Sequence, residues 1–341
     1  MSGVLERAWY KSAKWLVLFR PLSLFYTAMV TRRRAQWLSG GRAVYQAPVP
    51  VVVVGNISVG GTGKTPVVLA LIKLLRAQGY SPGVVSRGYG GRALAYPLRV
   101  TPSTPPDQSG DEPLLITSLS NVPLVVDPDR PRGVRALLEH AACDVVISDD
   151  GLQHYALGRD IEIAVVDAAR GLANGRCLPE GPLREPPERL ETVDFVLLNG
   201  ELSSPAWHKA HHFILEPRYA VCLSDAQVLN LADALINLQS SQVHAVAGIG
   251  NPQRFFNTLK ALGLDVIPHV FPDHHAFSAQ DFEFGDDYPI IMTEKDAIKC
   301  KGFSLQNAWA LGVEACFSEQ FLKHFLSRLD SVQSEVKHNG S

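Results

Sequence analysis

The sequence lacks paired cysteines and a strong charge imbalance. Its cysteines are odd in number and widely spaced, and none forms a C-x-x-C pair: Cys143, Cys177, Cys222, Cys300 and Cys316. This distribution argues against a disulfide framework or a cysteine zinc site and indicates reduced thiols in a cytosolic setting. The formal net charge of −2 gives no electrostatic case for a nucleic-acid partner. With 341 residues, the chain has room for two domains of ordinary size.

The N-terminal region also lacks an uninterrupted apolar run. Its least polar stretch, residues 15–30, is interrupted by Arg20-Pro21 and is shorter than the roughly 20 apolar residues that span a bilayer. No small-residue cleavage site follows this stretch, which argues against a secretory signal. Residues 1–42 combine Lys, Arg and aromatic side chains and contain a single acid, Glu6. This composition is typical of a helix lying in the headgroup plane of a membrane. The alternative is a helix packed on its own domain, with its basic residues solvated.

A glycine-rich turn follows the first strongly apolar run. The run is Val51-Val52-Val53-Val54, the turn is Ser58-Val59-Gly60-Gly61-Thr62-Gly63-Lys64-Thr65, and a helix-forming stretch continues from Pro66 to Ala77. Strand, turn and helix in this order are the layout of a phosphate-binding P-loop, whose backbone N–H groups approach a polyphosphate closely. Lys64 would reach the β- and γ-phosphates, and the Thr65 hydroxyl would ligate Mg²⁺. The usual first glycine is Ser58 here, and a chance glycine-rich turn is the alternative. The pattern predicts binding of ATP or GTP.

Apolar strands alternate with helices in both halves of the chain. Runs at residues 83–86, 144–148, 161–166 and 193–198 predict a mostly parallel sheet covered on both faces. The pattern restarts after Leu215, with further strands at 243–247, 289–292 and 309–313. We therefore expect an α/β protein with four parts. These are a membrane-associating segment (1–42), a nucleotide-binding domain (43–215), a smaller α/β domain (216–330) and a flexible polar tail (331–341).

Several acids follow strands or glycine-bounded loops. Asp149 and Asp150 come directly after an apolar strand, where P-loop proteins place an acid that supports Mg²⁺; an ordinary cap or turn is the alternative. Asp111 ends a loop rich in Pro, Ser and Gly, and it could accept a proton from an attacking hydroxyl. A solvated loop explains Asp111 equally well, and spacing does not separate it from Glu112.

A second charged group lies in the C-terminal half. Asp273-His274-His275 lacks the spacing of a zinc site, and a His paired with a carboxylate across a cleft fits it better. Thr293-Glu294-Lys295-Asp296 follows another strand, and here a satisfied surface cluster is an equally good interpretation.

Together these stretches resemble one family, the tetraacyldisaccharide 4′-kinases, which are the lipid A 4′-kinases of bacteria with an outer membrane. The resemblance runs through most of the chain and includes the relaxed P-loop that starts with Ser58. Its other motifs are Val53-Val54-Gly55-Asn56, Ser86-Arg87-Gly88-Tyr89-Gly90-Gly91, Gly110-Asp111-Glu112-Pro113, Asp149-Asp150-Gly151-Leu152-Gln153-His154, Leu178-Pro179-Glu180-Gly181-Pro182-Leu183-Arg184-Glu185, Ala247-Gly248-Ile249-Gly250, Asp273-His274-His275 and Thr293-Glu294-Lys295-Asp296-Ala297.

The resemblance implies transfer of the ATP γ-phosphoryl group to the 4′-hydroxyl of a tetraacylated disaccharide 1-phosphate. It also implies two α/β domains that close over a cleft, and a peripheral position on the cytoplasmic face of the inner membrane. Asp111 would act as base together with His274, and Lys64 would stabilise the γ-phosphate. Glu112, Asp149 and Asp150 would lie near Mg²⁺ and the phosphates. We further expect Arg87 or Arg184 to bind the lipid 1-phosphate, and we expect a monomer.

Two other classes share parts of this pattern. Membrane partition ATPases carry a lysine just before the two glycines, where this chain has Val59. Soluble P-loop ligases of the dethiobiotin-synthetase kind would not need a cationic, aromatic N-terminus.

Overall fold

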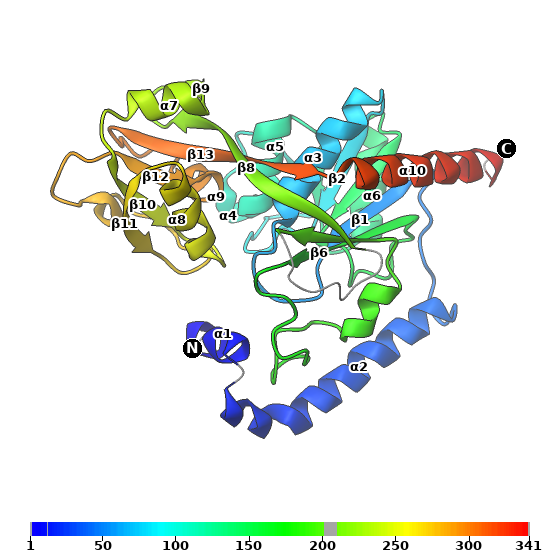
Figure 1. Ribbon diagram of the computed structural model, residues 1–341. Helices are drawn as coiled ribbons and strands as arrows, with labels where there is room; N and C mark the ends of the chain where they lie inside the picture. The colour runs from blue at the N-terminus through cyan, green and yellow to red at the C-terminus, as the bar shows by residue number, and fades with distance from the viewer. Residues whose placement is uncertain (1, 12, 201–209, 340–341) are drawn as a thin grey trace.

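The computed structural model describes residues 2–11, 13–200 and 210–339 of the chain. Met1 and Ser12 of the expected N-terminal segment, and Gly340 and Ser341 of the expected tail, lie outside these ranges. The described residues form two α/β lobes and an N-terminal helical segment (Figure 1). The expected α/β fold with a large, mostly parallel sheet is therefore confirmed.

The first lobe contains the P-loop and a sheet with the strand order β7-β6-β1-β5-β2-β4-β3. All neighbours in this order pair in parallel except β3 and β4, which are antiparallel. The strands are β1 (Val51–Gly55), β2 (Pro82–Ser86), β3 (Leu98–Val100), β4 (Leu124–Val126), β5 (Val145–Asp149), β6 (Ile161–Asp167) and β7 (Phe195–Asn199). The helices are α3 (Lys64–Ala77), α4 (Pro106–Ser109), α5 (Asp111–Ser120), α6 (Arg130–His140), the 3₁₀ helix η2 (Pro187–Glu191) and α10 (Glu319–Asn339).

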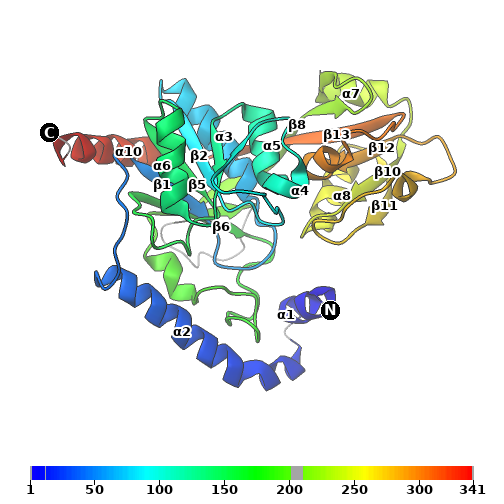
Figure 2. The ribbon, with the colours of Figure 1, turned by 180° about the vertical axis from the view of Figure 1, so that it is seen from behind.

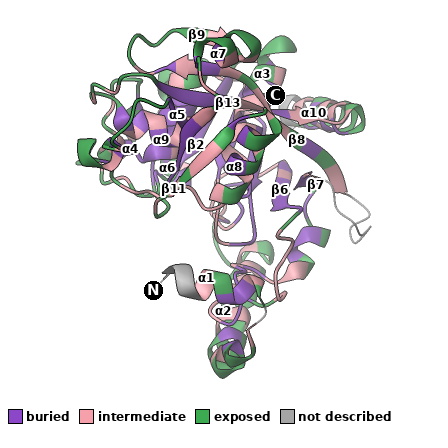
Figure 3. Ribbon diagram, turned by 60° about the vertical axis from the view of Figure 1, so that its left-hand side comes forward, coloured by how far each residue is buried: buried purple, intermediate pink, exposed green. Residues whose placement is uncertain are grey.

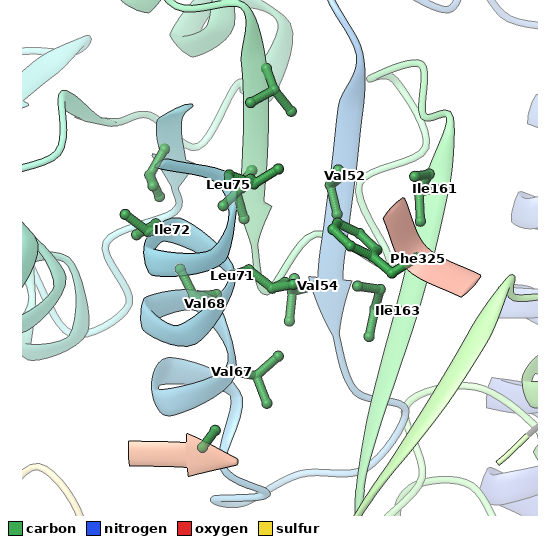
Figure 4. Packing of buried hydrophobic residues seen from close by; sticks show 14 of the residues in the cluster. Val52, Val54, Val67, Val68, Leu71, Ile72, Leu75, Ile161, Ile163 and Phe325 are labelled. Atoms are coloured by element: carbon green, nitrogen blue, oxygen red, sulfur yellow. The ribbon is translucent and has the colours of Figure 1, made fainter. Parts of the chain in front are cut away.

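The core of the first lobe lies on both faces of β1. Val52 and Val54 point to one face and pack with α3 and α10, as Figure 4 shows for Leu71 and Phe325. Val51 and Val53 point to the other face, where α6 and the loop before η2 cover them. Because both faces of the strand are buried, its residues are apolar without alternation, which is the signal that predicted a parallel sheet.

The second lobe repeats the pattern on a smaller scale. Its central strands, β10 (Gln242–Ala247), β11 (Asp265–Val270) and β12 (Ile290–Thr293), are parallel to one another. Its other elements are β9 (Val228–Asn230), α7 (Leu231–Asn237), α8 (Pro252–Ala261), α9 (Glu294–Ala297) and the 3₁₀ helices η3 (Ala279–Phe282) and η4 (Ile298–Cys300). Buried residues of α8 pack on one face of this sheet.

A long antiparallel ribbon joins the lobes, so that the strands of the described residues form a single 13-stranded sheet. It consists of β8 (Ala210–Cys222) and β13 (Ala308–Phe317), which cross the figure between the lobes (Figure 1). The start of β8 pairs in parallel with β7, while the start of β13 pairs in parallel with β12. Since β8 and β13 are antiparallel, the strands of the two lobes run in opposite directions. The carboxyl ends of both sets therefore face each other, and this arrangement positions the site.

The N-terminal segment lies apart from the sheet in both Figure 1 and Figure 2. It contains α1 (Ser2–Tyr10), the 3₁₀ helix η1 (Lys14–Phe19) and α2 (Arg20–Leu38). The break at Arg20-Pro21 falls at the start of α2, where proline lacks only a donor that would have no partner. Among residues 2–11, 13–200 and 210–339, no helix has both the length and the apolar character needed to cross a membrane.

Three local details differ from the sequence-based expectations. The polar loop before Glu112 contains α4, and Asp111 opens α5 instead of ending a loop. The helix α10 continues to Asn339, beyond the predicted start of the tail at 331, because Val332 extends its buried face. The predicted domain boundary between 215 and 216 falls inside β8, since the ribbon strand passes from one lobe to the other.

Candidate functional site

A cleft of about 1890 Å³ lies between the two lobes. The P-loop lines one side, and residues that follow β10, β11 and β12 line the other. The two sets of carboxyl strand ends therefore meet at one cavity, as ligand sites in open α/β sheets usually do.

The P-loop, residues 58–65, is held by its own lobe. Gly63, directly before the first turn of α3, has a φ of +98°, which is accessible to glycine. The Asn199 side chain at the end of β7 donates from Nδ2 to the Thr62 carbonyl at 3.0 Å. On the other flank, the N–H of Val59 donates to the Pro182 carbonyl at 2.9 Å. The first lobe thereby holds the loop from both flanks.

Asp150 forms ion pairs with two basic side chains, Lys64 of the P-loop and Arg184. Lys64 Nζ lies 3.5 Å from its Oδ1, and Arg184 Nη1 donates to its Oδ2 at 2.9 Å. Burial alone would raise the pKa of Asp150, but the charges of Lys64 and Arg184 outweigh it and hold the pKa well below the ordinary range. Asp150 is therefore a carboxylate at neutral pH.

Asp149 lies deeper, at the end of β5. Its side chain is buried and accepts a hydrogen bond from Ser86 Oγ at 2.9 Å, while Arg130 donates to its carbonyl at 2.9 Å. Burial, together with the nearby charges of Glu112 and Asp150, raises the pKa of Asp149 to about 7. A cation would favour the ionised form of this carboxyl.

Two interlocking glycine turns position Asp111. Gly110 directly precedes α5 with a φ of +83°, and a Cβ there would lie 2.5 Å from the Tyr89 carbonyl. The backbone of the Arg87–Gly91 turn therefore packs directly on the start of α5. Asp111 is mostly buried as a result, with its carboxylate facing the second lobe.

His274 approaches Asp111 from that second lobe. Its Nδ1 lies 3.0 Å from Asp111 Oδ2, and its ring lies 5.3 Å from the ring of Tyr89, centroid to centroid. His274 has a φ of +61°, which is unusual for a residue with a side chain. Such backbone strain often accompanies a functional constraint. The structure thus brings together two residues that are 163 positions apart.

Further contacts join the lobes around this pair. Lys295 Nζ lies 3.3 Å from Glu112 Oε1, and Arg254 Nη2 donates to Asp167 Oδ1 at 2.9 Å. Gly250 lies directly against the P-loop, since a Cβ at this position would be 2.8 Å from the N of Gly61. The second lobe therefore packs on both the P-loop and the start of α5.

The structure places nearly all predicted site residues at this cleft. The predicted residues that line the cleft are Val59, Gly60, Gly61, Thr62, Gly63, Lys64, Thr65, Arg87, Glu112, Asp150, Arg184 and His274. Ser58 and Asp149 lie behind this lining, and Asp111 reaches it through His274.

Sequence reasoning missed Asp167, Asn199 and Arg254. Asp167 and Asn199 end β6 and β7, so the rule that singled out Asp149 could have found them: a polar residue directly after an apolar parallel strand. Arg254 had no comparable signal, because its partner Asp167 is 87 residues away on the other lobe.

Comparisons with known proteins agree with this geometry. The family model described as tetraacyldisaccharide-1-P 4′-kinase matches residues 15–330. Proteins named tetraacyldisaccharide 4′-kinase from Pseudomonas paraeruginosa strain PA7 and Pseudomonas putida strain W619 are each 51% identical to the chain. The first alignment covers 97% of the chain and 98% of the relative, and the second covers 97% of each.

A solved structure is similar over almost the same length. It is described as the "apo" form of LpxK from Aquifex aeolicus in complex with ATP, and it superimposes with a TM-score of 0.76 at 30% identity. The match covers 92% of this chain and 99% of the other. Similarity over this length in sequence and structure excludes the two alternative classes, the membrane partition ATPases and the soluble P-loop ligases. The chain therefore belongs to the tetraacyldisaccharide-1-P 4′-kinase family, as its motifs predicted.

Proposed function

We propose that the protein transfers the γ-phosphoryl group of ATP to the 4′-hydroxyl of a tetraacylated disaccharide 1-phosphate in lipid A biosynthesis. The observation that carries the proposal is the Asp111–His274 pair: Nδ1 of His274 lies 3.0 Å from Oδ2 of Asp111, and His274 lines the same cleft as the P-loop. A phosphate cradle and an acid–base pair at one cleft are the parts that a kinase for a hydroxyl acceptor needs.

The donor side would work by charge neutralisation. The backbone N–H groups of the P-loop and the start of α3 bind the phosphates, and Lys64 stabilises the charge that develops on the γ-phosphoryl group. In the structure Lys64 lies 3.5 Å from Asp150. Asp150 therefore holds the ammonium group beside the loop, where it can move to a bound phosphate.

The acceptor side would work by proton transfer. Asp111 accepts the proton of the 4′-hydroxyl as that oxygen attacks the γ-phosphorus. The hydrogen bond with His274 fixes the direction of the carboxylate, as the third group of a catalytic triad fixes the base. Since His274 belongs to the second lobe, this orientation depends on contact between the lobes.

Mg²⁺ fits the acids beside the P-loop. Within the described residues, Oδ1 of Asp149 is buried without a hydrogen-bond partner, and Oδ1 of Asp150 has no hydrogen bond and only the Lys64 ammonium, 3.5 Å away, as an ion-pair partner. Both oxygens suit a position that faces a cation. No three His, Cys, Asp or Glu side chains within the described ranges form a metal site by themselves, so Thr65 and the nucleotide phosphates would supply further ligands. Glu112, whose charge acts on Asp149, is a further candidate ligand of Mg²⁺. When bound, Mg²⁺ would neutralise charge on the β- and γ-phosphates.

Arg87 is the better of the two candidates for the lipid 1-phosphate. Arg184 is engaged with Asp150, and its backbone N–H donates to the Ile57 carbonyl at 2.6 Å. Arg87 is exposed and lines the same cleft. An exposed guanidinium can bind a phosphate with two parallel hydrogen bonds.

The N-terminal segment would hold the protein on the cytoplasmic face of the inner membrane. One side of the segment packs on the first lobe, where Trp9 Nε1 donates to the Pro179 carbonyl and Ser23 Oγ donates to the Cys177 carbonyl. Leu18 and Phe25 point away, with 77% and 72% of their surface exposed. In Figure 3 much of α2 has the green colour of exposed residues. Exposed apolar residues next to basic ones are what a membrane-surface helix uses.

The test is incubation of the protein with γ-labelled ATP, Mg²⁺ and a tetraacylated disaccharide 1-phosphate in mixed micelles. We expect label in the lipid, and none in a matched acceptor whose 4′-position already carries a phosphate. A protein that binds ATP but leaves the lipid unlabelled would contradict the proposal.

A further inference from the structure

Lys295 is a second-lobe cation among acids from both lobes. It lies in the first turn of α9, directly after β12, and only 17% of its side chain is exposed. Its Nζ is 3.3 Å from Oε1 of Glu112 on the first lobe and 3.2 Å from Oδ1 of Asp273 on its own lobe. One ammonium group thus connects two carboxylates that belong to different lobes.

Asp273 is in turn a close neighbour of the catalytic histidine. Its Oδ1 accepts the backbone N–H of His274 at 3.1 Å, and its Oδ2 lies 3.8 Å from Nε2 of the same residue. The imidazole of His274 therefore has a carboxylate on each side, with Asp111 at 3.0 Å from Nδ1. The shorter distance to Asp111 identifies it as the present hydrogen-bond partner.

These contacts close a ring across the cleft. It passes from Asp111 to His274, from there to Asp273 and Lys295, and returns through Glu112, the chain neighbour of Asp111. Three of its five members are acids. Without the lysine, the acids of the first lobe would face Asp273 with no compensating ammonium, and the charge on Asp273 would attract the histidine away from Asp111.

We propose that Lys295 is a positioning residue for phosphoryl transfer, and that it acts through Asp273. By binding Oδ1 of Asp273, Lys295 keeps this carboxylate directed away from Nε2, so that His274 remains on Asp111. The proposal rests on the proposed function, because it concerns the same acid–base pair. It assigns a role to a charged motif that sequence reasoning left as a possible surface cluster.

The experiment is a double-mutant cycle with Lys295→Met, Asp273→Asn and the two combined, in the lipid-labelling assay. For Lys295→Met alone we expect kcat to fall about 10- to 100-fold, the loss that misplaced catalytic groups cause. The KM for ATP should stay within about twofold, because the P-loop is untouched. In the Asp273→Asn background the same lysine change should alter kcat by no more than about twofold, since the charge on which Lys295 acts is gone.

Lys301→Met is the matched control. Lys301 also contacts the first lobe from the second, with Nζ 3.4 Å from Ser118 Oγ, but it lies outside the ring. Its kcat should equal that of the wild type. Thermal unfolding and ATP binding of each variant show whether it is folded. If Lys295→Met alone does not fold, the comparison of the double variant with Asp273→Asn decides, and a further loss of more than about twofold refutes the proposal.

Two other results would overturn the assignment. Wild-type kcat in Lys295→Met would show that the ring does not position His274. An equal loss in both backgrounds would show that Lys295 acts on the substrate or through Glu112. Failure of the wild-type protein to label the lipid is a different result, since it contradicts the proposed function before any variant is measured.

Discussion

The contact between Gly250 and the P-loop gives a direct test of lobe packing. Gly250 has no positive φ, so alanine fits its backbone without strain. The added Cβ, however, would lie 2.8 Å from the N of Gly61, whereas ordinary contact begins at 3.4 Å. One of the two loops must therefore retreat by several tenths of an ångström.

The second lobe is the part that we expect to move. Asn199 and Pro182 hold the P-loop from both flanks within the first lobe. Movement of the second lobe lengthens the 3.0 Å separation between His274 and Asp111. Because a displacement near 1 Å can cost about 100-fold in rate, Gly250→Ala should lower kcat about 10- to 100-fold. This corresponds to about 1.4 to 2.7 kcal/mol in the barrier.

The assay is steady-state labelling of the lipid acceptor, with ATP affinity measured separately by titration. We expect ATP affinity to change by less than about threefold, because no group that contacts the phosphates is removed. Lys260→Ala, an exposed change on the adjacent helix α8, is the control and should behave as the wild type. Wild-type kcat in Gly250→Ala would refute the view that this contact sets the geometry of the acid–base pair.

Three further predictions concern other parts of the molecule. Asp111→Ala should lower kcat about 100- to 10,000-fold while ATP still binds, and normal turnover would remove Asp111 from the mechanism. Burial raises the pKa of Glu294 to about 7 from an ordinary value of 4.5, so the folded protein loses stability as pH rises through this window. Glu294→Gln should therefore be more stable than the wild type at pH 8, with a free energy of unfolding higher by at most about 3 kcal/mol, but not at pH 5. Thermal unfolding at both pH values measures this, and an equal difference at both would contradict the prediction. Leu18→Glu and Phe25→Glu should each weaken sedimentation with anionic liposomes about tenfold. Val228→Glu changes a residue of the second lobe that is also mostly exposed, and it should not weaken sedimentation. If all three variants bind alike, another surface binds the membrane.

The parts of the site that were predictable depend on local sequence. The P-loop follows a strand and opens a helix within about 15 residues, so its glycines and Lys64 could be assigned without knowledge of the rest of the fold. Asp149 and Asp150 were found for a similar reason, since the end of a buried strand is visible as the end of an apolar run. His274 was singled out by its acidic neighbour, although the pattern could not show which carboxylate on the other lobe it would meet.

The parts that were missed depend on long-range pairing. The prolines and glycine before Asp111 predict a loop, but contact of Gly110 with the Tyr89 carbonyl fixes the chain so that a helix starts there. The role of Lys295 follows from the opposite directions of the strands in the two lobes, which place the end of β12 against α5. Neither cause is visible in a window of sequence, because in each case the partner lies in a distant segment.

The N-terminal segment is attached to the first lobe, so under the proposed membrane binding it is the second lobe that can move relative to the membrane. Trp9 and Leu16 pack with Val59 of the P-loop in one apolar cluster, and Arg20 pairs with Glu180 of the first lobe at 2.9 Å. If α2 lies on the bilayer as proposed, the P-loop is held at a fixed height above the surface in which the acyl chains of the acceptor remain. The second lobe is joined to the first by the β8–β13 ribbon and by side-chain contacts across the cleft, and we propose that it opens while the first lobe stays on the membrane. In this proposal, lobe movement admits nucleotide and brings His274 to Asp111, while the acceptor and the phosphate cradle keep their relative positions.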